Sequence, residues 1–406
     1  MSIIKVPKIL IPKENIDLEK WAVIACDQFT SQRDYWDKLD SFCGEVSTLR
    51  ITYPEIYLNE DREARVKNIN STMKKYLQSD IFRAVDSFIL TVRTTKYGRK
   101  RVGLVISFDL EQYDYTKQLS VRATEATVPE RLPVRVKIRE KACLELPHAL
   151  LLLDDSEKSI IEPLYQNKDK MQKLYSTKLN NDGGYIEGYK VENPEEIIDK
   201  IEKLCSGENL KRKYGSDKPF MFAVGDGNHS IATAKLCWES LKKTLKPEER
   251  VSHPARFCLC ELVNLYEDDL IFEPIHRVVF NAKKEFVDYM QSTLKGEEKI
   301  MLNYNGEEYI CNVDKNSAVA IGQIQEAIDK YLASHKELEQ DYVHGTNHTL
   351  EVAKENNGVA VFMPKLQKSD LFKFISTGKI LTRKSFSMGE AEEKRYYLEC
   401  KQIKEI

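Results

Sequence analysis

The sequence predicts a mixed α/β (α+β) protein, and three observations support that prediction. Short apolar runs bounded by polar residues or glycine predict buried strands, because a strand covered on both faces needs no polar alternation. Amphipathic segments with helix-start signals lie between these runs. The chain has 406 residues, of which 42% are hydrophobic, so it is long enough for more than one core.

The predicted elements alternate along the chain. Residues 95–101 predict a hairpin tip with Gly98 in the turn, since the neighbouring residues are charged. Asn193 and Pro194 precede two glutamates and an apolar stripe, which is a complete helix-start signature. Apolar runs predict strands at 21–28, 101–110, 149–153, 219–224, 256–262 and 358–362. Helical periodicity predicts helices at 61–77, 230–245, 284–294, 323–338 and 369–377.

Charge and cysteine content narrow the functional classes. The 62 Lys and Arg residues nearly balance 64 Asp and Glu residues, whereas a nucleic-acid binder usually carries a clearly basic domain. No apolar run approaches the ~18 residues of a membrane span, and the N-terminus has no signal-type segment. Nine cysteines without a CxxC pair are typical of reduced thiols in the cytosol. We therefore expect a cytoplasmic protein that contacts neither nucleic acid nor membrane, with its oligomeric state left open.

A strand, a glycine-containing turn and a helix follow one another at residues 220–235. The turn reads Gly225-Asp-Gly-Asn-His-Ser230 and lacks the Walker pattern. Glycines let the backbone approach a ligand closely, and a helix N-terminus favours an anion. Asp226 could hold a metal ion or accept a proton, and His229 could bond or protonate a phosphate. The alternative is a plain turn in which Ser230 only caps the helix. The predicted phosphate-binding residues here are Gly225, Gly227, Asn228 and Ser230.

A cationic segment at residues 120–139 precedes this loop. Arg122 and Arg131 could clamp a phosphate through their forked guanidinium groups, and Glu125 lies among cations that favour its ionised form. The alternative is a solvated strand, which the alternation of charged and apolar residues over 134–139 favours. We therefore weight Arg122, Glu125 and Arg131 above the later cations.

Two further clusters are less specific. Residues 378–390 combine hydroxyls and cations with glycine, a composition that suits an anion but is common in surface loops. Cys258 and Cys260 alternate on a predicted apolar strand, so we expect them in a core rather than on zinc. His276 lies near a turn and is a structural residue unless the fold brings it to the anion loop.

Six motifs resemble one family, in order, over nearly the whole chain. They are Trp21–Gln28, Arg122–Glu125, Leu146–His148, Gly225–Lys235, Phe272–Arg277 and Lys384–Gly389. The family is widespread and long labelled as a domain of unknown function. Its Asp-Gly-Asn-His-Ser element is similar to the Asp-Gly-His-His-Arg element of archaeal ADP-dependent free-serine kinases, in the ParB and sulfiredoxin-like superfamily. Within the family, the sequence most resembles pyrophosphate-dependent serine kinases.

The resemblance implies a ParB/sulfiredoxin-like core with additional N- and C-terminal α/β regions. The implied boundaries are an N-terminal region at 1–120, a phosphate-binding core at 121–278, and a C-terminal domain at 279–406 that closes the substrate site.

The implied activity is transfer of a phosphoryl group from inorganic pyrophosphate to the hydroxyl of free L-serine, with Mg²⁺. The products would be phosphate and O-phosphoserine, an intermediate of serine and cysteine biosynthesis. Glu125 would take the serine proton, with Asp226 as the other candidate base and the metal ligand. The motif's departure from the archaeal element suits a donor smaller than ADP. The implied substrate-binding residues are Thr124, His276, Arg383, Lys384, Ser385 and Ser387.

Other functions remain open at this point. The chain could use ADP or ATP as donor, or a polyol as acceptor. It could also be a phosphate- or nucleotide-binding regulator without activity, or a DNA-associated protein, although the balanced charge opposes DNA binding.

Overall fold

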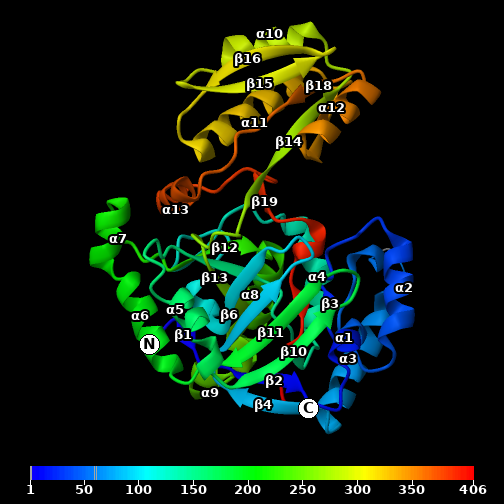
Figure 1. The fold of residues 1–406 in the computed structure, drawn as a ribbon, viewed down its shortest axis with the longest axis vertical. Helices are drawn as coiled ribbons and strands as arrows, with labels where there is room; N and C mark the ends of the chain where they lie inside the picture. The colour runs from blue at the N-terminus through cyan, green and yellow to red at the C-terminus, as the bar shows by residue number, and fades with distance from the viewer. Residues whose placement is uncertain (1, 59, 61) are drawn as a thin grey trace. The chain divides into compact units, whose positions relative to one another are not determined.

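The computed structural model describes residues 2–58, 60 and 62–406, and of Arg131 the backbone only. The chain forms two compact units (Figure 1). Unit 1 consists of Met1–Ala123, Thr127–Leu270 and Glu390–Ile406, and unit 2 consists of Thr124–Ala126 and Ile271–Gly389. The prediction of a mixed α/β fold is confirmed, because both units combine helices with sheets.

A mixed sheet forms the centre of unit 1. Over the described residues its order is β10-β11-β5-β6-β13-β9-β12-β7, with β1 paired to β6 outside this path. The β12–β7 and β13–β9 pairs are parallel and the others antiparallel. The strands are β1 (Ile4–Lys5), β5 (Ile89–Thr94), β6 (Lys100–Asp109), β7 (Val121–Ala123), β9 (Leu150–Leu153), β10 (Lys173–Leu179), β11 (Gly184–Lys190), β12 (Phe222–Asp226) and β13 (Phe257–Asn264).

Apolar cores cover both faces of this sheet. Leu104 and Ile106 pack into one core with Trp238, whereas Val105 packs into the other with Trp21. Because neighbouring strand residues point to opposite faces, this double burial explains the continuous apolar run in β6. The helices of unit 1 are α1 (Leu18–Trp21), α2 (Arg33–Cys43), α3 (Arg62–Gln78), α4 (Leu132–Arg139), α5 (Ile161–Gln166), α6 (Pro194–Leu204), α7 (Gly207–Tyr214), α8 (Asn228–Leu241) and α9 (Pro247–Ser252).

The C-terminal segment, red in Figure 1, is part of unit 1. Its strands β20 (Tyr396–Tyr397) and β21 (Lys401–Gln402) pair with β3 (Val23–Ile24) and β8 (Leu144–Glu145). A further pair joins β2 (Lys8–Pro12) to β4 (Phe82–Asp86). The two ends of the chain are thus built into one unit.

Unit 2 contains a second sheet. Its order over the described residues is β16-β15-β18-β14-β17, all antiparallel, and β19 extends the pairing of β14. The strands are β14 (Phe272–Phe280), β15 (Glu298–Tyr304), β16 (Glu307–Val313), β17 (Glu339–His344), β18 (Val359–Val361) and β19 (Phe386–Met388). The helices are α10 (Lys284–Thr293), α11 (Ser317–Ser334), α12 (Thr346–Glu355) and α13 (Lys368–Ser376).

Three predicted elements differ from the structure. Residues 134–139 are helical, in α4, and the strand interpretation is wrong. Pro133 fixes a φ that suits the first turn of a helix, and a six-residue alternation is too short to decide otherwise. Helix α11 begins before residue 323 because the Asn316 side chain accepts the Val319 N–H. Of the expected strand 21–28, only Val23–Ile24 is extended in β3. Asp61, at the start of one expected helix, lies outside the described residues.

The units also divide the chain differently from the expected regions 1–120, 121–278 and 279–406. Strands β5 and β6 of the first region share one sheet with β9, β12 and β13 of the second. The order of strands along the chain does not reveal which strands pair. The expected boundary at residue 120 therefore falls between strands that belong to one sheet.

Candidate functional site

The glycine-containing turn joins β12 to α8 in unit 1. Gly227 is the N-cap residue of α8 and has φ +81°, in the left-handed region that favours glycine. A Cβ at Gly227 would lie 2.8 Å from the Cα of Ala149, so this position also needs glycine for close backbone approach. Among the described residues, no side chain caps α8. The interpretation of Ser230 as a helix cap is therefore wrong, since Ser230 is the third residue of α8.

The turn presents features that suit an anion. The first N–H groups of a helix have no partner within the helix, and the helix dipole places partial positive charge there. The side-chain Oδ1 of Asn228 is buried and has no hydrogen-bond partner among the described residues. This oxygen is an acceptor, so it calls for a donor such as a hydroxyl or an ammonium group and does not itself favour an anion.

Asp226 is paired with a lysine that the sequence did not indicate. Its Oδ1 accepts the Gly227 N–H at 2.8 Å, and its Oδ2 lies 2.9 Å from Nζ of Lys394. Burial alone would lower the pKa of Lys394, but Asp226 and Asp27 raise it. The predicted catalytic carboxylate is thus one half of an ion pair.

His148 lies against the same turn. A Cβ at Gly227 would be 3.1 Å from its Cδ2. Its Nε2 is 3.6 Å from Oδ2 of Asp27, and its Nδ1 is 2.6 Å from the Tyr397 hydroxyl. Burial opposes protonation, yet Tyr397 and Asp27 raise the pKa of His148 well above its usual value. His148 and Asp27 lie in motifs of the family resemblance, but no chemical pattern singled them out.

His229 is held by a backbone contact. Its Nε2 accepts the Val128 N–H at 3.2 Å, and its carbonyl oxygen accepts the Thr233 hydroxyl at 2.7 Å. Its predicted contact with a phosphate stays a prediction.

Of the two arginines predicted to clamp a phosphate, only Arg122 has a described side chain. Arg122 is 4% exposed, and it donates to the carbonyls of Leu119 at 3.0 Å and Pro219 at 2.8 Å. The bond to Pro219 holds β7 to the segment before β12. The side chain of Arg131 lies outside the described part of the structure. Phosphate binding by either arginine stays a prediction.

In unit 2, the structure brings together two motifs that the sequence proposed separately. Oε1 of Glu125 accepts the Ser385 N–H at 3.3 Å, and the carbonyl of Thr124 accepts the Leu381 N–H at 2.8 Å. Lys384, next to Ser385, has φ +55°, a conformation that costs about 1 kcal/mol or more for a side chain of this kind. The predicted base and the predicted substrate loop thus form one cluster.

The buried side chain of Arg277 supports the loop that contains Lys384 and Ser385. Arg277 has no exposed surface, and it donates to the Lys384 carbonyl at 3.1 Å and to Gln325 Oε1 at 2.8 Å. Burial lowers the pKa of Arg277 to about 10, although Tyr342 and Glu125 oppose the change. Arg277 remains charged at neutral pH and adds positive potential next to this loop. The sequence placed Arg277 only in a family motif, without a role.

Two other predicted substrate residues make internal contacts. His276 is 5% exposed, and its Nδ1 accepts the Met363 N–H at 3.1 Å. The Ser387 hydroxyl donates to the Gly389 carbonyl at 3.0 Å. For His276 this is the structural role that the sequence left open.

The buried His276 is expected to lower the stability of the folded protein in acid. Burial, and secondarily Arg277, lower its pKa to about 4, against about 6.5 in an unfolded chain. Below about pH 6.5 only the unfolded chain takes up this proton, so the free energy of unfolding falls by up to about 1.4 kcal/mol per pH unit. The loss ends near pH 4, where the folded state also binds the proton. Urea unfolding at several pH values should show a weaker pH dependence for His276→Gln, whose amide oxygen can still accept the Met363 N–H. An identical dependence in both proteins would contradict this.

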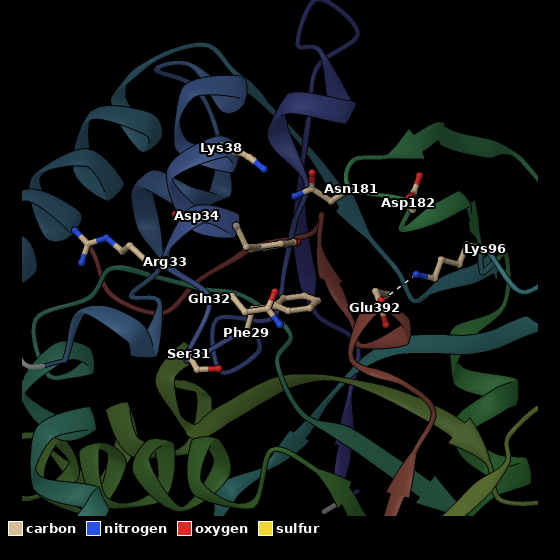
Figure 2. A pocket seen from close by; sticks show the side chains of 11 residues that line it. Phe29, Ser31, Gln32, Arg33, Asp34, Lys38, Lys96, Asn181, Asp182 and Glu392 are labelled. Atoms are coloured by element: carbon tan, nitrogen blue, oxygen red, sulfur yellow. Dashed lines mark hydrogen bonds and ion pairs between the residues drawn. The ribbon is translucent and has the colours of Figure 1, made fainter. Parts of the chain in front are cut away.

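A separate cavity of about 730 Å³ lies in unit 1 (Figure 2). Phe29 stacks on Tyr35 at 4.1 Å on one side, and Lys96 pairs with Glu392 at 2.9 Å on another. Its lining carries charges of both signs, so it indicates no single ligand class. The lining residues are Phe29, Ser31, Gln32, Arg33, Asp34, Tyr35, Lys38, Lys96, Asn181, Asp182 and Glu392.

The described residues form neither a metal-binding cluster nor a membrane-spanning helix. In the described ranges, no three His, Cys, Asp or Glu side chains gather as they would around a metal ion. Cys258 and Cys260 are buried in β13, as the sequence predicted. No described helix is both long and apolar enough to span a bilayer.

Comparisons with known proteins identify a family. Residues 10–340 match the family model described as "Protein of unknown function (DUF1015)". No curated protein matches the sequence significantly.

Several solved structures are weakly similar. A free serine kinase in complex with AMP is 11% identical, with a TM-score of 0.37, over 74% of this chain and 91% of that chain. A conserved hypothetical protein from Pyrococcus furiosus is 10% identical, with a TM-score of 0.34, over 72% and 90%. SbnI from Staphylococcus aureus, truncated at its C-terminus, is 8% identical, with a TM-score of 0.36, over 70% and 83%. Similarity this low carries no activity from one protein to another.

Proposed function

We propose that this chain, which belongs to the DUF1015 family of proteins of unknown function, transfers a phosphoryl group from inorganic pyrophosphate to the hydroxyl of free L-serine. The observation that carries the proposal is the turn before α8. There, a glycine in the left-handed region meets a helix N-terminus that no described side chain caps. The six family motifs of the sequence support pyrophosphate and serine as the substrates.

The turn in unit 1 would bind a phosphate of the donor. Phosphoryl transfer passes through a loose transition state, so positioning and charge compensation contribute most to its rate. The N–H groups of Asn228, His229 and Ser230 would face phosphate oxygens. The described residues offer no cage for a metal ion, and Asp226 is already paired with Lys394. Mg²⁺ would therefore arrive with the substrate, as magnesium pyrophosphate.

The cluster in unit 2 would bind the amino acid. Glu125 would take the proton of the serine hydroxyl, and the cations Arg383 and Lys384 would attract the carboxylate. The serine oxygen forms a bond to phosphorus while the bridging P–O bond of pyrophosphate breaks. Phosphate leaves with the bridging oxygen, and the proton passes to Glu125.

Phosphorus NMR of the purified chain with magnesium pyrophosphate and L-serine tests the proposal. We expect equal amounts of O-phosphoserine and phosphate. Pyrophosphate hydrolysis without phosphoserine would remove serine as the acceptor. Phosphoserine formed from ADP or ATP but not from pyrophosphate would correct the donor. Ligand binding with no turnover on any donor and acceptor would indicate a regulator instead.

A further inference from the structure

Lys394, which faces Asp226, lies in a segment whose backbone is held by contacts with unit 1. Lys394 belongs to the segment 390–395, which enters unit 1 near the C-terminus. Arg93 donates to the carbonyls of Glu393 at 3.0 Å and of Lys394 at 2.6 Å. This buried guanidinium fixes the backbone on which Lys394 stands.

The two neighbours of Lys394 in sequence are anchored by ion pairs. The carboxylate of Glu393 has no exposed surface and lies 3.2 Å from Arg99 and 3.8 Å from Arg101. Arg395 pairs with Glu261 and, at 2.6 Å, with Glu399. Buried ion pairs add little net stability, but removal of one partner leaves a buried charge unpaired, which is costly. The segment is thus anchored on both sides of Lys394, which lies 2.9 Å from Asp226.

The Lys394 side chain remains partly accessible. Its side chain is 17% exposed, and that of Asp226 is 34% exposed. Asp226 directly precedes Gly227, the N-cap of α8. The lysine thus places an ammonium group, paired with the Asp226 carboxylate, beside the partial charges of the helix N-terminus, and Lys is a common phosphate ligand.

We infer that Lys394 is a phosphate-binding residue of this turn, supplying through its ammonium the positive charge that a metal ion on Asp226 would otherwise supply. Asp226 is then a positioning residue for Lys394 rather than a metal ligand. The inference rests on the proposed function only in taking the ligand to be a phosphate. It requires that the chain bind pyrophosphate even when no divalent ion is present.

Calorimetric titration with pyrophosphate in EDTA tests this inference. We expect Lys394→Met to raise Kd at least about tenfold, since a charged hydrogen bond is lost. The same weakening is expected in the double variant Lys394→Met, Asp226→Asn, in which no carboxylate is left unpaired. The control Lys96→Met, which breaks the exposed pair with Glu392, should bind as the parent does.

Two results would overturn the inference. If the double variant regains the parent affinity, Lys394 only neutralises Asp226. If the parent does not bind pyrophosphate without magnesium, the ammonium does not replace a metal. A parent that binds pyrophosphate through Lys394 but forms no phosphoserine would leave the inference standing and remove the proposed function.

Labelling of the unaltered protein supplies a measurement that does not depend on how the variants fold. Acetylation of lysines, read by mass spectrometry, should slow at Lys394 when pyrophosphate is present and stay unchanged at Lys96. Equal labelling of Lys394 with and without pyrophosphate would count against the inference.

Discussion

Glu125→Gln is expected to lower kcat for phosphoserine formation by about 10² to 10⁴, the usual contribution of a general base. Glutamine keeps an oxygen that can accept the Ser385 N–H, which Glu125 accepts at 3.3 Å. The loop should therefore stay in place while the proton acceptor is lost. The KM values for serine and pyrophosphate should change little, because only the chemical step is affected.

A neighbouring acid provides the control for this variant. Glu130 is exposed in the short 3₁₀ helix Pro129–Arg131, and Glu130→Gln makes the same chemical change five residues away. It should leave kcat within about twofold. Near-normal turnover in Glu125→Gln would remove this residue from the role of base. A rise in KM for serine with unchanged kcat would assign it to substrate binding instead.

Gly227→Ala is expected to destabilise the protein by about 2–5 kcal/mol. A side chain at φ +81° costs about 1–2 kcal/mol. The new Cβ would also lie 2.8 Å from the Cα of Ala149, and such overpacking costs about 1–3 kcal/mol. Relief of the clash would move the turn, so pyrophosphate affinity should fall as well. Urea unfolding and calorimetric titration measure the two effects.

Gly215→Ala separates conformational cost from steric cost. Gly215, at the C-cap of α7, has φ +70°, and a Cβ there would meet no atom of the described residues within 4 Å. This control should cost only about 1–2 kcal/mol and should leave pyrophosphate binding unchanged. Equal destabilisation in the two variants would show that the approach of Ala149 does not constrain the turn.

The sequence predicted the parts of the molecule that depend on local pattern. Strand β6 was predictable because burial on both faces leaves an unbroken apolar run, and α6 because Asn193 and Pro194 signal a helix start. The turn before α8 was predictable from its glycines. The strand prediction for residues 134–139 was wrong because a short alternating pattern also fits a helix, and Pro133 favours a first helical turn.

The contacts around the turn could not be predicted in the same way. Lys394 stands 168 residues from Asp226 in the chain, and nothing in its own neighbourhood distinguishes it from other lysines. The pairing of His148 with Asp27 likewise depends on how distant segments pack. The junction of Glu125 with Ser385 follows from the fold of unit 2, although the sequence had selected both residues for the same reaction. The sequence indicated which side chains have suitable chemistry, but it did not indicate which side chains contact one another in the fold.

A crystal structure of the chain soaked with pyrophosphate would locate the donor site. We predict a phosphate group at the turn before α8, within hydrogen-bond distance of the N–H groups of residues 228–230 and of the Lys394 ammonium. Pyrophosphate bound elsewhere, for example in the cavity beside Tyr35, with the turn before α8 empty, would contradict it.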